Sequence, residues 1–318
     1  MNATTKFAGF AVGLAAVFGI AVAVGATIGP DPDPSGPAGH GGHAAPSAPG
    51  PSTDMPGGLM VTDQGYTLEL DKPNTTTAAQ TPISFRILDA TGAPVTKYQT
   101  SHDKDLHLIV VRRDMAGFQH VHPVLDPAGT WSVPLNLSRA GDYRVFADFT
   151  PAGGSNLTLG ADLRVAGNYD VQALPAPAAT ARVGEYEITL TGTITPGAAS
   201  PVTLSVSRNG APVTDLQPYL GAYGHLVALR AADLAYLHVH PEGAPGDGVT
   251  PAGPGVDFVV NAPSTGDYRL FLDFQHQGVV RTAEFTLSVT TSNEAAAAPT
   301  APTAPTAPAN HGAPGHGH

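Results

Sequence analysis

The sequence of 318 residues contains no cysteine. This absence excludes disulfide bonds, thiolate zinc sites and cysteine nucleophiles. A metal site in this chain would have to use imidazole, carboxylate or thioether ligands. Imidazole suits copper, zinc and nickel, whereas sites built only from oxygen ligands suit magnesium and calcium.

Charged side chains are also scarce, because they make up 13% of the chain. Lysine and arginine number 15 against 26 aspartates and glutamates, so the formal net charge is −11. Proteins that bind nucleic acid usually carry a basic stripe or patch. We therefore expect no nucleic-acid partner.

One long apolar run is present near the start of the chain. It covers residues 7–28, is 22 residues long and follows Lys6. At about 1.5 Å per helical residue it is long enough to cross the roughly 30 Å hydrocarbon core of a bilayer. We assign residues 1–29 to a transmembrane anchor or, as the alternative, to a signal peptide cleaved near Ala21-Val22-Ala23. Both interpretations place the remainder outside the cytoplasm, either bound to the cell membrane by a single pass or secreted.

Two segments are too rich in proline, glycine and alanine to bury a core. Residues 30–58 and 291–318 have this composition, and both contain histidines. We predict that both are disordered. They leave two predicted domains between them, at residues 59–167 and 168–290.

The two domains are copies of one another. The string GAPVT at 92–96 returns at 210–214, and GDYRVFADF at 141–149 returns as GDYRLFLDF at 266–274. The length of each copy suits a duplicated domain better than a solenoid repeat.

Alternation of apolar and polar residues with period two predicts β-strands throughout both copies. No long stretch beyond the first apolar run has strong helical periodicity. Six or seven short strands in about 110 residues are typical of a β-sandwich. The predicted fold class is therefore all-β, with two tandem immunoglobulin-like β-sandwich domains. The expected strands lie at 66–70, 82–88, 107–112, 131–137, 143–149 and 156–165, and at 186–191, 202–208, 225–230, 256–260, 268–274 and 279–289.

Three histidines with fixed spacing occur once in each copy. The first set is His107, His120 and His122, followed by Pro123, and the second set lies 118 residues further along the chain. Residues i and i+2 of a strand share one face, so the last two imidazoles of each set should stand side by side. A hairpin would fold the preceding strand back and bring the third imidazole near them. Three such nitrogens are a plausible set of ligands for copper or, less favoured, zinc. The predicted metal ligands are His107, His120, His122, His225, His238 and His240.

Two matching aspartates are candidates for the remaining coordination position. Asp148 and Asp273 occupy equivalent places in the two copies, on the strand face opposite the core aromatics. Either would bind the ion directly or hold an imidazole in one tautomer. The alternative is a solvated carboxylate paired with Arg144 or Arg269. His102 and His276 have no counterpart in the other copy, so we expect both in surface loops.

The histidines also have interpretations that involve no metal. Paired imidazoles at the end of a strand can hydrogen-bond to backbone carbonyls and fix loops. Clustered histidines can also act as a pH sensor. Convergence of three nitrogens would favour a metal, and rings directed at backbone carbonyls would favour a structural role.

The strings HLIVVRRDMAGFQHVHP and GDYRVFADF, with their counterparts in the second copy, resemble a bacterial extracytoplasmic family common in actinobacteria. They are similar to YtkA-like and FixH-like domains and, more distantly, to copper-resistance sandwiches of the CopC type. The resemblance covers about residues 60–290. It implies a role in copper handling, with the six histidines as ligands, although this chain has neither the N-terminal histidine brace nor the methionine-rich sites of CopC-type proteins.

The sequence contains no nucleophile elbow, no HExxH helix and no phosphate-binding glycine loop. We therefore predict that the protein is not an enzyme. The leading hypothesis is an extracytoplasmic protein that binds a metal ion, with copper favoured, and buffers or delivers it. The alternative is a structural or interaction protein of the cell envelope whose histidines stabilise the fold.

Overall fold

The computed structural model describes residues 55–237 and 239–291, all of them in strands, turns and loops. Among these residues no helix is long and apolar enough to span a membrane. The predicted anchor, both predicted disordered segments and His238 lie outside the described residues, apart from 55–58 and 291. Both sandwiches belong to one compact unit.

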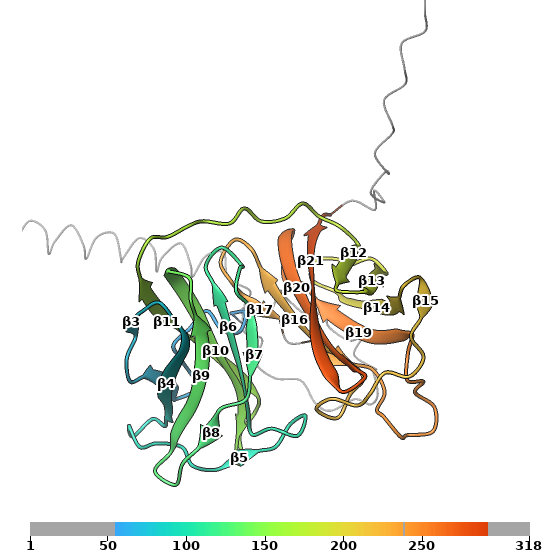
Figure 1. Cartoon of the computed structure of the whole chain (residues 1–318). Helices are drawn as coiled ribbons and strands as arrows, with labels where there is room; N and C mark the ends of the chain where they lie inside the picture. Colours follow the sequence, from blue (N-terminus) through green and yellow to red (C-terminus); the bar gives the residue numbers. More distant parts are fainter. Residues whose placement is uncertain (1–54, 238, 292–318) are drawn as a thin grey trace, which may run out of the picture. The chain divides into compact units, whose positions relative to one another are not determined.

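The first domain is a sandwich of two sheets (Figure 1). Its outer sheet has the order β1 (Thr62–Asp63), β2 (Tyr66–Leu70), β4 (Ala78–Leu88), β9 (Thr130–Leu137), β8 (Val124–Leu125). Its inner sheet has the order β3 (Asn74–Thr76), β11 (Leu157–Ala166), β10 (Gly141–Pro151), β6 (Leu106–Arg112), β7 (Gln119–Val121), and β5 (Tyr98–Gln99) pairs with β10.

The second domain repeats this arrangement. Its outer sheet has the order β12 (Thr180–Val183), β13 (Tyr186–Thr191), β14 (Ala199–Arg208), β19 (Gly255–Asn261), β18 (His240–Pro241), and β15 (Ala211–Pro212) pairs with β14. Its inner sheet has the order β17 (Tyr236–Leu237), β16 (His225–Arg230), β20 (Gly266–His276), β21 (Val279–Val289).

The predicted fold class is confirmed by these sheets. Four predicted strands have the observed bounds, namely β2, β13, β16 and β21. Each sandwich closes on its own apolar cluster, and Trp131, Phe149 and Leu163 are examples from the first. The alternation of apolar and polar residues predicted these strands because the inward residues of each strand fill the core, while the intervening residues of the outer sheets face solvent.

The inner sheets do not follow that alternation, because they are covered on both faces. All seven residues of β6 are buried. Their second face belongs to a third apolar cluster, which contains residues of both domains. Its buried members are Ile109, Val111, Met115, Phe146, Val227, Leu229, Leu234, Tyr236 and Phe271. The two sandwiches therefore pack directly against each other through their inner sheets.

Candidate metal site between the two domains

The first histidine set is brought together by a hairpin between β6 and β7. These strands pair antiparallel, with Ile109 opposite His120 and Leu108 opposite Val121. The turn reverses through Met115 and Gly117, both with positive φ, and a hydrogen bond from the Met115 amide to the Arg112 carbonyl closes it at 2.8 Å. Val121 packs against the core of the first domain, which leaves its two histidine neighbours on the opposite face.

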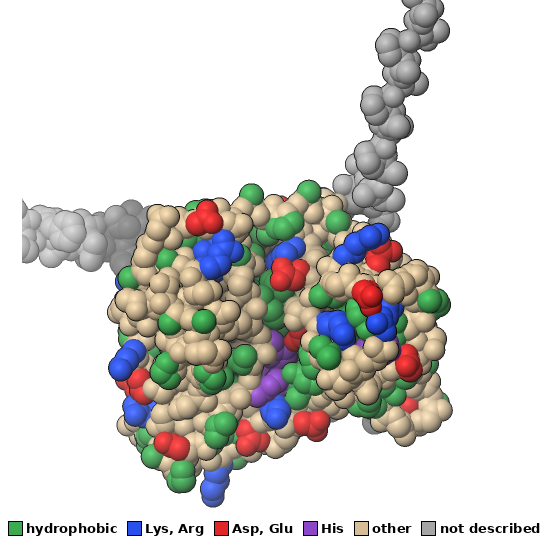
Figure 2. Space-filling view, viewed as in Figure 1, with side chains coloured by type: hydrophobic (Ala, Val, Ile, Leu, Met, Phe, Trp, Pro, Cys, Tyr) green, Lys and Arg blue, Asp and Glu red, His purple; other side chains and the backbone are tan. Residues whose placement is uncertain are grey.

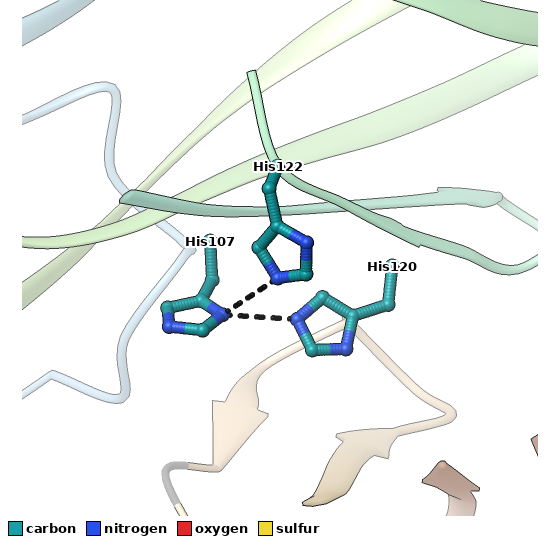
Figure 3. A group of neighbouring side chains, drawn as sticks. All are labelled: His107, His120 and His122. Carbon is teal, nitrogen blue, oxygen red and sulfur yellow. Dashed lines mark hydrogen bonds between the residues drawn. The ribbon is translucent and has the colours of Figure 1, made fainter. Parts of the chain in front are cut away.

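Three ring nitrogens converge on this face (Figure 3). His107 Nδ1 lies 3.1 Å from His120 Nε2 and 3.2 Å from His122 Nε2. Two nitrogens that bind one ion tetrahedrally at about 2.0–2.1 Å lie roughly 3.3 Å apart. The two nitrogen pairs that include His107 Nδ1 therefore have nearly the spacing of metal ligands, and all three nitrogens lie within 4.8 Å of one another.

The outer nitrogens of two of these rings are already engaged. His107 Nε2 lies 3.1 Å from the Ser101 carbonyl oxygen, so it is the protonated nitrogen and donates. His120 Nδ1 lies 2.7 Å from Asp273 Oδ2 and donates to that carboxylate. When both rings are neutral, the two remaining nitrogens carry lone pairs that face each other across 3.1 Å. Such a pair cannot form a hydrogen bond without an added proton, and it is suited to binding a cation.

The site is poorly solvated, which disfavours charged imidazole rings. Burial lowers the pKa of His107 to about 4 and that of His122 to about 3. Repulsion from neighbouring histidines is a second cause that already contributes to these lowered pKa values. These two rings are therefore neutral at pH 7, which is the form that binds metals.

The second domain contributes residues to the same place. The His225 ring lies 6.4 Å from the His120 ring and 5.1 Å from the His102 ring, measured between centroids. Burial lowers the pKa of His225 to about 4. A cavity of about 40 Å³ is lined by His102, His107, His120, His225 and Asp148, among others. Histidine side chains are visible at the base of a hollow in Figure 2.

His225 repeats the loop contact of its counterpart. Its Nε2 lies 2.7 Å from the Tyr219 carbonyl oxygen, as His107 Nε2 lies near that of Ser101. The two carbonyls are 118 residues apart, so they are equivalent in the duplication. Both histidines thus fix the loop that precedes their strand. Of the predicted second set, His238 and the side chain of His240 lie outside the described residues, so that set stays a prediction.

The two aspartates are buried rather than solvated. Asp148 is 5% exposed and Asp273 is 4% exposed. The expected pairing with Arg144 or Arg269 is wrong, because Arg144 pairs with Asp162 and Arg269 with Glu284. The apolar residues on this face form the domain contact, which shields both carboxylates from water.

Each carboxylate instead contacts the other domain. Asp273 accepts from His120 of the first domain, and Asp148 accepts from the Tyr236 hydroxyl of the second at 3.2 Å. Asn156 also donates to Asp148, at 2.9 Å. Asp273 therefore holds one imidazole of the histidine cluster in a fixed tautomer.

The expectation that His102 and His276 lie in surface loops is wrong for His276, whereas His102 lies in a turn between β5 and β6. His102 is half-buried at the cavity. His276 ends β20 and is 5% exposed, with Nδ1 at 2.8 Å from the Tyr186 hydroxyl and Nε2 at 3.1 Å from Asp215. A missing counterpart in the other copy therefore did not indicate exposure. No signal in the sequence identified the contact between His102 and His225.

Several solved structures have limited similarity to this chain. The Escherichia coli adhesin FdeC is 16% identical over 72% of this chain and 65% of its own, with a TM-score of 0.23. Invasin, a bacterial integrin-binding protein, is 14% identical over 73% and 41%, with a TM-score of 0.20. A Salmonella alpha-2-macroglobulin is 14% identical over 75% and 16%, with a TM-score of 0.25. The chain thus spans less than two thirds of each of these proteins.

No curated protein matches the sequence. A family model described as a domain of unknown function, DUF8832, matches residues 60–167 and again residues 181–291. The two matches agree with the internal duplication and together cover more than half of the chain. The protein therefore belongs to the DUF8832 family and contains two copies of its domain.

Proposed function

We propose that this protein binds a transition-metal ion at the histidines His107, His120 and His122. One observation carries the proposal: His107 Nδ1 and His120 Nε2 lie 3.1 Å apart while Ser101 and Asp273 occupy the other nitrogens of these rings, so two neutral rings oppose their lone pairs. The third imidazole directs its Nε2 toward the same point. A cation bound by both nitrogens removes the repulsion between their lone pairs.

Copper is the favoured ion, and zinc is second. All three candidate ligands are imidazole nitrogens, and the affinity of such sites for divalent metals is highest for copper. The resemblance of the histidine strings to YtkA-like, FixH-like and CopC-type domains also supports copper. We assign the protein a role in buffering or delivering this ion outside the cytoplasm, on a membrane anchor or in secreted form, and no catalytic activity.

A structural role is the second candidate, and a specific arrangement favours it. If His120 is an imidazolium paired with Asp273, its Nε2 donates to His107 Nδ1 and every one of these contacts is satisfied without a metal. His107 and His225 also fix equivalent loops through their carbonyl contacts. In this case the cluster stabilises the contact between two domains of an envelope protein, and a proton takes the place of the metal.

Titration of the protein with copper and zinc distinguishes these candidates. The predicted disordered segments contain five histidines that would bind metal weakly, at positions 40, 43, 311, 316 and 318. We therefore specify the full chain in detergent with these five replaced by alanine, and call it the tail-silent protein. Isothermal calorimetry should give stoichiometric binding of copper.

The decisive variant is His120→Ala with His122→Ala in the tail-silent protein. It should bind one ion fewer per chain than its parent. The matched control is His276→Ala, which removes a buried histidine with two side-chain partners outside the cluster and should leave the stoichiometry unchanged. Equal stoichiometry in parent and double variant would reject the metal proposal, and lower thermal stability in that variant would then support the structural role.

A further inference from the structure

We infer that the metal site is completed by the second domain, through Asp273 acting as the positioning residue for His120. The part of this inference that is tested by metal affinity rests on the proposed function. The contact is short, with 2.7 Å between His120 Nδ1 and Asp273 Oδ2, and the two side chains are only 5% and 6% exposed. A carboxylate that accepts from the outer nitrogen of a metal-binding imidazole fixes its tautomer and raises its basicity.

Asp273 is itself held in place. Its second oxygen, Oδ1, accepts from Thr282 Oγ1 at 2.5 Å. Thr282 lies directly opposite Asp273 in the ladder between β20 and β21, and His225 lies opposite it on the other side. The two carboxylate oxygens thus have different partners, one within the second domain and one across the interface. This arrangement leaves the carboxylate little freedom to turn away from His120.

The interface that places Asp273 has an approximate twofold relationship. Phe118 of the first domain stacks on Phe271 of the second, with ring centroids 3.8 Å apart. Their counterparts in the duplication, Tyr236 and Phe146, also contact each other, with centroids 5.6 Å apart. An interface in which residue i contacts j and the counterpart of j contacts that of i is isologous, as in a symmetric dimer.

The first domain has no equivalent carboxylate at its own His120. Its matching aspartate, Asp148, lies opposite His107 in the ladder and contacts Tyr236 and Asn156. The carboxylate that orients His120 therefore comes from the second domain, whereas His107 is oriented by the Ser101 carbonyl of its own domain. Ion binding and domain packing are then linked, because each stabilises the arrangement that the other requires.

The test is the variant Asp273→Asn in the tail-silent protein. The neutral amide can no longer provide the charge that favours a donating Nδ1, and it also offers its own N–H groups to the ring. We expect copper or zinc affinity at the triad to fall about 10–100-fold, the usual effect of losing such an outer partner. The matched control is Asp215→Asn, which removes a carboxylate that contacts a histidine outside the cluster, His276, and should bind metal as tightly as the parent.

A second readout needs no metal. In ¹⁵N-detected histidine spectra of the metal-free parent, His120 should have a protonated Nδ1, and Asp273→Asn should lose this fixed protonation while Asp215→Asn keeps it. Unchanged affinity and unchanged His120 signals in Asp273→Asn would overturn the inference, as would an equal loss of affinity in Asp215→Asn. If the parent binds no metal at the triad, the proposed function fails, but the nitrogen spectra still decide whether Asp273 positions His120.

Discussion

Phe118 and Phe271 stack face to face across the two domains, with their ring planes 6° from parallel. Phe271 is fully buried although it lies on the side of β20 that faces away from the core of its own sandwich. The two sandwiches are therefore joined by a packed apolar contact in addition to the linker at residues 167–179.

Replacing Phe271 should weaken the first domain, although the residue belongs to the second. Phe271→Ala removes a buried ring and should lower the free energy of unfolding by about 3–5 kcal/mol. Phe271→Leu keeps most of the apolar contact and should cost less. Trp131 is the single tryptophan and lies in the core of the first domain, so its fluorescence during urea unfolding reports on that domain. A Trp131 transition that does not move in Phe271→Ala would show that the domains do not stabilise each other.

Similar arginine–aspartate pairs in the two hairpin turns should differ in their effect on stability. Arg112 and Asp114 are 1% and 5% exposed, and two hydrogen bonds of 2.8 and 2.6 Å join them. Arg230 and Asp233 make the same two-bond contact but are 17% and 38% exposed. Arg112→Met leaves a buried carboxylate unpaired and should cost about 3–5 kcal/mol.

The matched variant Arg230→Met should cost less, because water can solvate Asp233. Urea denaturation of both variants measures the difference. Equal losses in the two variants would contradict the conclusion that burial makes the first pair the more important one.

The metal-free protein should lose stability as the pH falls from about 6.5 to about 4. Burial lowers the pKa values of His107 and His225 to about 4 and that of His122 to about 3, from the usual 6.5. Between these values the unfolded chain binds more protons than the folded protein, so the free energy of unfolding rises with pH. Aspartates with lowered pKa values, such as Asp89, lose their contribution only below about 3.8.

Thermal unfolding in the presence of a chelator, at several pH values, checks this expectation. The melting temperature should fall steadily between pH 6.5 and pH 4.5. His225→Gln can still donate to the Tyr219 carbonyl but does not titrate, so its profile should be flatter than that of the parent. A melting temperature that stays constant over this interval would show that the histidines are not buried in neutral form.

Much of the fold could be predicted from the sequence, because strand alternation depends on local pattern. Most of the long strands in both copies were predicted from the sequence. In these strands, residues that face the core, such as Trp131 and Leu135, alternate with polar or small residues. Short strands such as β3 and β5 were not predicted, because two or three residues carry no period. The apolar run HLIVVR in β6 does not alternate, and its continuity is the signal that the inner sheet is covered on both sides.

The candidate site was predicted only in part. Spacing alone placed His120 and His122 on one face, and the hairpin brought His107 to them, because both depend on local strand geometry. The contribution of the second domain was not predicted, since the contact of Asp273 with His120 depends on how the two sandwiches pack. The outward-facing Phe146 and Phe271, repeated in GDYRVFADF and GDYRLFLDF, are the residues that could have indicated this contact.

The most direct test of the metal site is a crystal structure of the protein grown with copper or zinc, with anomalous diffraction measured at the absorption edge of the metal. Metal coordination at the three histidines predicts an anomalous peak at about 2.0–2.1 Å from His107 Nδ1, His120 Nε2 and His122 Nε2. The contact between His120 Nδ1 and Asp273 should be retained. A crystal grown with metal that has no anomalous peak at the three histidines, and in which His120 Nε2 is still 3.1 Å from His107 Nδ1, would contradict metal binding at this site.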